Sequence, residues 1–152
     1  MRFASLGSGS KGNATLIAAG NTMLLVDCGF TQKDTVSRLA RLGVAPEQLD
    51  AILVTHEHGD HVSGVAALSR RYQIPVFLSH GTAASGKVNG AFSQVRINAG
   101  DAFSIGEIDV RSIPVPHDAR EPIQFRLSYA NHCLGILTDL GSITPHVIDA
   151  YS

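Results

Sequence analysis

The stretch Thr55-His56-Glu57-His58-Gly59-Asp60-His61 places five metal-binding or acid–base side chains within six consecutive positions. It follows directly on the apolar run Ala51-Ile52-Leu53-Val54, which predicts a buried strand over residues 51–55. A buried strand that ends in imidazoles and a carboxylate is costly unless those groups are paired or bind an ion. We therefore expect this strand end to coordinate metal.

The composition of the whole chain is that of an ordinary globular domain. The 152 residues are 44% hydrophobic and 16% charged, which excludes disordered, collagen-like and coiled-coil classes. This length is enough for one domain with its own core. Because the formal net charge is only -1, any binding of nucleic acid must depend on local groups such as Lys11 and Arg120.

The two cysteines, Cys28 and Cys133, are far apart and do not form a C-x-x-C motif. They predict buried thiols in a reducing compartment. The N-terminus has no unbroken apolar segment, and no run approaches the length of a membrane span. These features predict a cytoplasmic protein that does not enter a membrane.

The first third of the chain predicts antiparallel strands followed by a helix. The turn-rich residues 8–13 and the pair Gly20-Asn21 separate apolar runs, as in hairpins. Thr31 and Asp34 resemble a capping box, and a helical period then continues to Gly43.

The rest of the chain alternates between helical and strand patterns, which indicates an α/β (α+β) fold. A helix is expected after the histidine-rich loop, over residues 62–72, and a weaker one near residues 80–86. A last helix is expected to begin at Thr144-Pro145. The further strands are expected at residues 75–78, 95–97, 102–105, 108–115, 123–129 and 133–138.

Spacing divides the metal-binding side chains into two pairs. In an extended segment, side chains two apart point the same way, so His56 and His58 can hold one ion from one side. Asp60 and His61 lie at the start of the next helix and point in a different direction. Since four donors so close in sequence fit one tetrahedral shell poorly, we expect two adjacent ions.

Two later residues can complete these pairs, because each stands where an apolar strand ends in a loop. They are His117 and Asp139. Ligands delivered from strand ends converge on one edge of a sheet. Each has a simpler alternative: His117 as an ordinary loop histidine, and Asp139 as a cap for the helix near Thr144.

The pattern H-x-H-x-D-H at residues 56–61 resembles the signature of the metallo-β-lactamase-fold hydrolase superfamily. The superfamily's third histidine matches His117, its bridging aspartate matches Asp139, and its early strand-end aspartate matches Asp27. The resemblance implies an αββα sandwich. The matching residues occur in the same order as in the superfamily, and the resemblance covers nearly all of the chain up to Asp139.

Within this superfamily, two short segments look like those of the YycJ or WalJ subgroup. They are the loop at residues 8–13 and the sequence Thr138-Asp139-Leu140-Gly141. Members of that subgroup are regarded as metal-dependent nucleases. The resemblance therefore implies a nucleic-acid partner, DNA rather than RNA, and exonuclease activity.

The resemblance also implies a role for each site residue. A hydroxide held between two divalent ions would attack a phosphodiester, since coordination lowers the pKa of water toward roughly 7. Zinc best suits the first site, whose ligands are all nitrogen atoms. The second site combines oxygen and nitrogen ligands and would also accept manganese or iron. The implied assignments are His56, His58 and His117 on the first ion; Asp60 and His61 on the second, with Asp60 also catalytic; Asp139 as bridge; and Asp27 orienting a ligand imidazole, unless it is only a turn residue before Gly29. Apart from the resemblance, the composition of the loop at residues 8–13 makes Ser10 and Lys11 candidates for contact with phosphate, although loops of this composition are more often hairpin connections.

The sequence departs from the superfamily pattern after Asp139. The second ion normally receives a further histidine well beyond that position, and here only His146 follows, seven positions on. The resemblance therefore implies that residues 1–152 are the N-terminal part of one longer domain. The second sheet is then expected to expose an edge or to pair with another chain, which would permit self-association.

Three other functions are compatible with the same residues. The first is hydrolysis of a thiolester or lactone, in the manner of glyoxalase II. The second is a redox di-iron protein on the same fold, against which His58 argues, because glutamate is typical at that position. The third is a chain that binds metal without catalysis.

Overall fold

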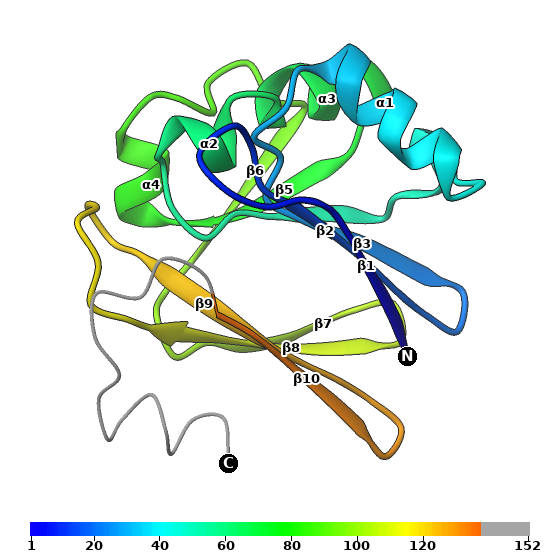
Figure 1. The fold of residues 1–152 in the computed structure, drawn as a ribbon. Coiled ribbons are helices and arrows are strands. Elements are labelled where there is room, and N and C mark those ends of the chain that lie inside the picture. Colours follow the sequence, from blue (N-terminus) through cyan, green and yellow to red (C-terminus); the bar gives the residue numbers. More distant parts are fainter. Residues whose placement is uncertain (138–152) are drawn as a thin grey trace.

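The computed structural model describes residues 1–137 and consists of two stacked β-sheets with helices on one side (Figure 1). Asp139 and the helix expected at Thr144 lie outside the described residues. The first sheet has the strand order β1-β2-β3-β4-β5-β6, and the second has the order β10-β9-β8-β7. The mixed α/β class predicted from the sequence is confirmed.

The elements have the following bounds. The first sheet contains β1 (Arg2–Gly7), β2 (Ala14–Ala19), β3 (Thr22–Val26), β4 (Ala51–Leu53), β5 (Pro75–Ser79) and β6 (Ser93–Ile97). The second contains β7 (Ala102–Ile105), β8 (Ile108–Pro114), β9 (Ile123–Tyr129) and β10 (His132–Ile136). The helices are α1 (Gln32–Arg41), α2 (Gly59–Val62), α3 (Val65–Tyr72), α4 (His80–Ala84) and the short 3-10 turn η1 (Pro46–Gln48).

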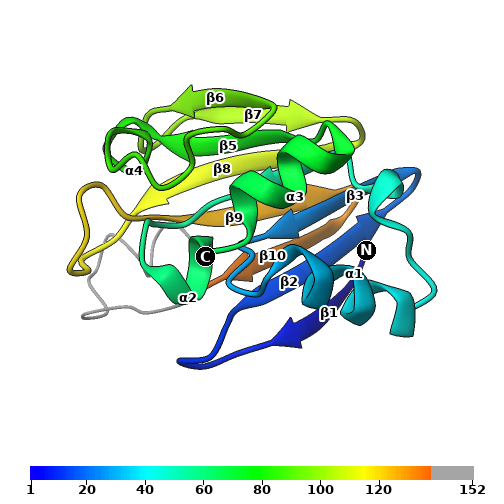
Figure 2. The same ribbon diagram turned by 90° about the horizontal axis from the view of Figure 1, so that it is seen from above.

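Strand direction determines where the functional residues gather. The strands β1, β2 and β3 are antiparallel neighbours, whereas β3, β4, β5 and β6 run parallel. Parallel strands end at the same edge of a sheet, and ligands bind at the carboxyl end of such strands. Both views place α2, α4 and the loop between β8 and β9 at this end (Figures 1 and 2).

Two apolar layers hold the sandwich together, and β3 contributes to both. Leu24 packs in the cluster between the two sheets, and its neighbour Leu25 packs in the cluster beneath the helices. Both side chains are fully buried, which stabilises the fold by about 1.5–3 kcal/mol each. The helical layer includes Leu39 from α1 and Leu68 from α3.

The first helix begins as the sequence predicts. The side chain of Thr31 accepts a hydrogen bond of 3.1 Å from the backbone N–H of Asp34. This bond satisfies one of the donors that every helix start leaves without an intrahelical partner.

The prediction of one helix over residues 62–72 is wrong, because two helices, α2 and α3, occupy this region. The break falls at Gly64, whose backbone N–H donates to the carbonyl of Cys28 over 2.9 Å. A Cβ at this position would collide with the carbonyl oxygen of Phe30. The close approach of the segment after β3 therefore interrupts the helix.

The strand predicted over residues 51–55 ends earlier, at Leu53. Val54 still donates to the carbonyl of Phe77 on β5. The backbone N–H of Thr55 instead donates to Oδ1 of Asp27 over 2.8 Å. The strand ends because a carboxylate replaces the neighbouring strand as the hydrogen-bond partner.

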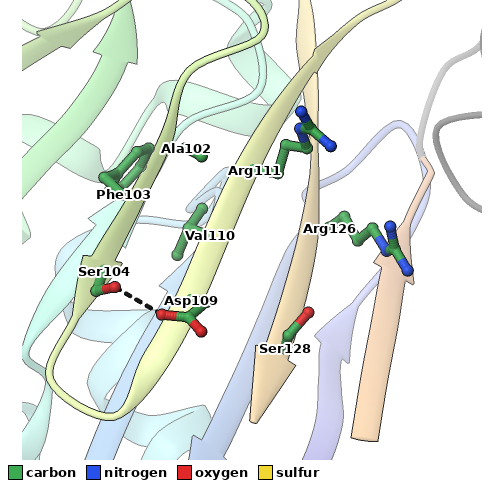
Figure 3. Close-up of a pocket in the computed structure, with 8 residues that line it drawn as sticks. All are labelled: Ala102, Phe103, Ser104, Asp109, Val110, Arg111, Arg126 and Ser128. Carbon is green, nitrogen blue, oxygen red and sulfur yellow. Dashed lines mark hydrogen bonds between the residues drawn. The ribbon is translucent and has the colours of Figure 1, made fainter.

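The outward face of the second sheet explains why the prediction of two buried cysteines is wrong for one of them. Cys28 is buried as expected, but Cys133 on β10 is exposed. Its thiol accepts a hydrogen bond of 2.9 Å from Arg126. Among residues 1–137 no helix covers this face (Figure 1). It forms a shallow concavity lined by Ala102, Phe103, Ser104, Asp109, Val110, Arg111, Arg126 and Ser128 (Figure 3).

No helix within the described part of the chain has the length and apolar character needed to cross a membrane.

Candidate metal centre

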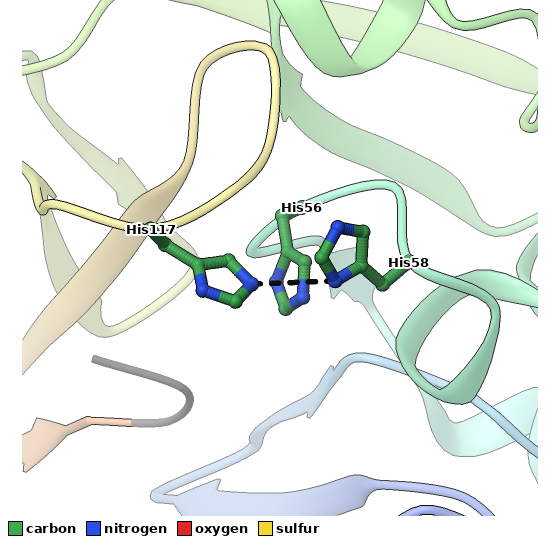
Figure 4. A group of neighbouring side chains, drawn as sticks. All are labelled: His56, His58 and His117. Atoms are coloured by element: carbon green, nitrogen blue, oxygen red, sulfur yellow. Dashed lines mark hydrogen bonds between the residues drawn. The ribbon is translucent and has the colours of Figure 1, made fainter. Parts of the chain in front are cut away.

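Three histidines from two distant segments converge at the carboxyl end of the first sheet (Figure 4). His56 and His58 follow β4, and His117 lies in the loop between β8 and β9. One ligand nitrogen from each lies within 4.8 Å of the others. Nε2 of His117 is 3.3 Å from Nδ1 of His58. The convergence expected from strand ends is therefore observed for His117.

The three rings are packed against one another but not sealed from solvent. The centroid of the His56 ring lies 4.7 Å from that of His58 and 4.5 Å from that of His117. His56 is buried, whereas His58 and His117 are half-buried. An ion or a substrate can therefore reach the site from the side of the latter two residues.

Asp27 orients two neighbouring imidazoles, His61 directly and His56 through Thr55. Its Oδ2 accepts hydrogen bonds of 2.7 Å from Thr55 Oγ1 and 2.7 Å from His61 Nδ1. Since the hydroxyl of Thr55 donates to Asp27, it accepts from Nδ1 of His56, which is 2.8 Å away. Both histidines thus carry the proton on Nδ1, so Nε2 is the nitrogen that would bind a metal.

The backbone at Asp27 makes this arrangement possible. Asp27 has a φ of 61°, in the left-handed region that aspartate tolerates better than most residues. The chain therefore turns sharply after β3, and the next residue, Cys28, donates its backbone N–H to the carbonyl of His61 over 2.8 Å. This bond brings the loop after β3 against α2.

Burial raises the pKa of the Asp27 carboxyl above its usual value, while the hydrogen bonds from His61 and Thr55 partly oppose this increase. The side chain is almost wholly shielded from water. A carboxylate in such a place interacts strongly with the imidazoles that it contacts.

Asp60 and His61 lie beside the three-histidine cluster. The ring of His61 is fully buried, and its centroid is 4.3 Å from that of His56. Its Nε2 is 3.6 Å from Oδ2 of Asp60, whose side chain is 29% exposed. The predicted second pair thus lies next to the first.

Asn13 connects the glycine-rich loop to Asp60. Its Nδ2 lies 3.2 Å from Oδ2 of Asp60 and 3.1 Å from the carbonyl of the same residue. The backbone N–H of Asn13 donates to that carbonyl over 2.8 Å, and its Oδ1 accepts from Gly9 over 3.0 Å. One side chain therefore stabilises the loop and holds the carboxylate.

The remaining site residues have different outcomes. Ser10 and Lys11 are exposed in the loop between β1 and β2, and their contact with phosphate stays a prediction. The bridging role of Asp139 also stays a prediction. The sequence had not indicated Thr55 or Asn13 as parts of the site. Thr55 directly precedes the motif, and this position was the signal that could have identified it.

The donor set fits a divalent ion. Three neutral imidazole nitrogens suit zinc, copper, iron or nickel, and the added carboxylate of Asp60 would also suit manganese. The hydrogen bonds from Nδ1 of His56 and His61 to oxygen acceptors are of the kind that orient metal-binding histidines.

Comparison with known proteins identifies the family. Residues 7–143 match the family model described as the Metallo-beta-lactamase superfamily. The chain belongs to this superfamily. The family expected from the H-x-H-x-D-H motif is therefore confirmed.

Two curated superfamily relatives are exodeoxyribonucleases by name. The chain is 35% identical to exodeoxyribonuclease WalJ of Streptococcus pneumoniae over 150 residues, covering 94% of this chain and 55% of the relative. It is 32% identical to exodeoxyribonuclease YycJ of Bacillus anthracis over 148 residues, covering 95% of this chain and 56% of the relative. The chain spans about half the length of these relatives.

Solved structures of superfamily members share the fold. The Rm3 metallo-beta-lactamase aligns with a TM-score of 0.73 and 19% identity, covering 97% of this chain and 66% of that chain. At this identity the likeness concerns the fold alone. It supports the αββα sandwich expected from the motif.

Proposed function

We propose that this protein is a metal-dependent hydrolase that cleaves phosphodiester bonds of DNA as an exonuclease. The observation that carries the proposal is the convergence of His56, His58 and His117, with ligand nitrogens within 4.8 Å. The similarity to exodeoxyribonucleases over nearly the whole chain supports DNA as the substrate.

The proposed site holds two divalent ions. His56, His58 and His117 would hold the first, and Asp60 and His61 would hold the second, with Asp139 as a bridge. Zinc is the proposed metal, and manganese or iron are the alternatives. When bound, such ions lower the pKa of a coordinated water toward about 7 and neutralise negative charge on a phosphate.

The protein groups around the ions have distinct tasks. Asp27 keeps the proton of His61 on Nδ1 and, through Thr55, keeps the proton of His56 on Nδ1. Asp60 is the proposed catalytic carboxylate, because its side chain is partly exposed and can face a substrate.

The phosphate backbone of DNA would meet the exposed loop between β1 and β2. Lys11 in this loop is a cation, and Asn13 joins the loop directly to Asp60. The loop is therefore suited to bring a phosphate to the metals, with Ser10 as a second contact. Since the net charge of the chain is only -1, this local contact matters more than any general attraction.

The test is hydrolysis by the purified protein after removal of metal and reloading with zinc or manganese. We expect stepwise shortening of end-labelled linear DNA, lost with chelator and restored by metal. Asp60→Asn should lower the rate by about 100-fold or more. The matched variant Asp109→Asn, on the outward face of the second sheet, should not change it.

The same preparations distinguish the alternatives. Degradation of RNA in preference to DNA would change the proposed substrate. Hydrolysis of a thiolester or lactone with no cleavage of DNA or RNA would overturn the nuclease proposal. Tight metal binding without any hydrolysis would leave only a metal-binding protein.

A further inference from the structure

Glu57 lies between the two histidines of the H-x-H segment, but its side chain points away from them into the protein. It is only 7% exposed. Its Oε1 accepts a hydrogen bond of 2.9 Å from the backbone N–H of Arg120. Its Oε2 accepts one of 3.3 Å from the hydroxyl of Thr82 on α4. A buried carboxylate with these partners is a structural connection between segments far apart in sequence.

The backbone that Glu57 contacts belongs to the loop that carries His117. This loop, residues 115–122, connects β8 to β9. Within it, Ala119 donates to the carbonyl of His117 over 2.9 Å, and Arg120 follows immediately. The hydrogen bond from Arg120 to Glu57 therefore fixes the chain three residues beyond the third histidine.

Contacts from α4 hold the same loop from a second direction. The hydroxyl of Ser79 donates to the carbonyl of Glu121 over 2.7 Å. The backbone N–H of Gly81 donates to Oε1 of the Glu121 side chain over 2.9 Å. A Cβ at Gly81 would lie 2.6 Å from Cβ of Glu121. The loop thus packs directly on the start of α4 and on Glu57.

We infer that Glu57 is a positioning residue that fixes the His117 loop against the H-x-H segment and so completes the three-histidine metal site. The alternating direction of side chains along an extended segment explains how Glu57 does this. In an extended segment, His56 and His58 point to one side and Glu57 to the other. The backbone that aims two imidazoles at the ion therefore also aims a carboxylate at the loop that delivers the third.

This inference rests on the metal site of the proposed function but adds a residue that is not a ligand. Loss of the Glu57 side chain would leave the part-buried backbone N–H of Arg120 without its acceptor and would loosen the loop. The cost should appear in metal affinity, because an unfixed third ligand must be ordered each time an ion binds. Groups that orient metal ligands typically change affinity by about 10–100-fold.

The test is a set of zinc affinities measured by competition with a chromophoric chelator. Glu57→Ala should weaken zinc binding by about tenfold or more. Glu57→Gln keeps an amide oxygen for Arg120 and should restore most of the affinity. The control Glu107→Ala removes a similar carboxylate-to-backbone bond, from Asn21 over 2.7 Å at the far side of the fold, and should leave affinity unchanged.

A double variant separates positioning from general loss of structure. In a His117→Ala background, Glu57→Ala should cause no further loss of zinc affinity, because the loop then carries no ligand. A loss equal to that in the wild type would overturn the inference, as would an unchanged affinity in Glu57→Ala itself. If the wild type binds no zinc, both the proposed function and this inference are overturned. If the wild type binds zinc and Glu57→Ala binds it equally well, only this inference is overturned.

Discussion

The Oδ2 atom of Asp27 accepts a 2.7 Å hydrogen bond from Nδ1 of His61, a residue of α2 that is wholly buried. This bond connects the end of β3 to the start of α2. It also determines which nitrogen of His61 is available for a metal.

Asp27→Asn should reverse this hydrogen bond. The Asn oxygen would face the N–H of Thr55, where Oδ1 now lies, so the amide NH2 would face Nδ1 of His61. His61 would then carry its proton on Nε2, which cannot bind an ion. The same amide NH2 would donate to Thr55, whose hydroxyl would then donate to Nδ1 of His56 and move that proton to Nε2 as well. We expect the affinity for both ions to fall, by about 10–100-fold each, as measured by calorimetric titration.

The control for this variant is Asp109→Asn. It alters an exposed carboxylate that accepts a hydrogen bond from Ser104, distant from the metal centre. If Asp27→Asn bound both ions as tightly as the wild type, the tautomer argument would be refuted.

His117→Ala should remove one ion and spare the other. It deletes one of three nitrogens from the first site, whereas Asp60 and His61 are untouched. The expected metal content after gel filtration is one ion per chain in place of two. His132→Ala removes an exposed histidine of β10 and serves as the control.

Retention of both ions by His117→Ala would show that His117 is not a ligand. Loss of both ions would show instead that the two sites are not separable.

Asn13→Ala should weaken the second site and the glycine-rich loop together. The side chain makes bonds to the carbonyl of Gly9 and to both the carbonyl and the carboxylate of Asp60. Losing bonds of this kind typically costs about 0.5–1.5 kcal/mol each. We expect a lower midpoint of thermal unfolding in Asn13→Ala and a weaker second site, measured by calorimetric titration with the metal.

The exposed Asn89 gives the matched substitution, and Asn89→Ala should change neither quantity. Equal metal affinity in Asn13→Ala and Asn89→Ala would argue that Asp60 does not need its amide partner.

Cys28 should make the stability of the fold decrease at alkaline pH. Burial raises the pKa of its thiol from 9.0 to about 11, against the effect of its contact with Thr35. In the unfolded chain the thiol ionises at lower pH, so its contribution to stability is complete below pH 9.0 and is lost as the pH rises toward about 11. This contribution is about 2–3 kcal/mol.

The measurement is the free energy of unfolding at a series of pH values from 8 to 11 in wild type, Cys28→Ala and Cys133→Ala. The decrease should be smaller only in Cys28→Ala, because Cys133 is exposed. The same decrease in both variants would assign the effect to other groups. An alkylating reagent should label Cys133 in the folded protein and Cys28 only after unfolding.

Local patterns in the sequence predicted most of the elements and the centre of the site. Periodicity located β7 and β9 at their observed bounds, and the Thr31 cap located the start of α1. The H-x-H-x-D-H motif indicated the superfamily, because metal ligands need particular residue types at particular spacings. These features depend on neighbouring residues, so they can be read along the chain.

The contacts that connect distant segments form only when the chain has folded. Gly64 interrupts a helix because the carbonyl of Phe30 lies against it, and Cys133 is exposed because the described chain leaves its face of the sheet uncovered. Glu57 lies between two histidines in the sequence, and only the fold shows that its carboxylate contacts the backbone of the loop that carries His117. Such contacts depend on which surfaces meet after folding, and no local pattern of residue types specifies them.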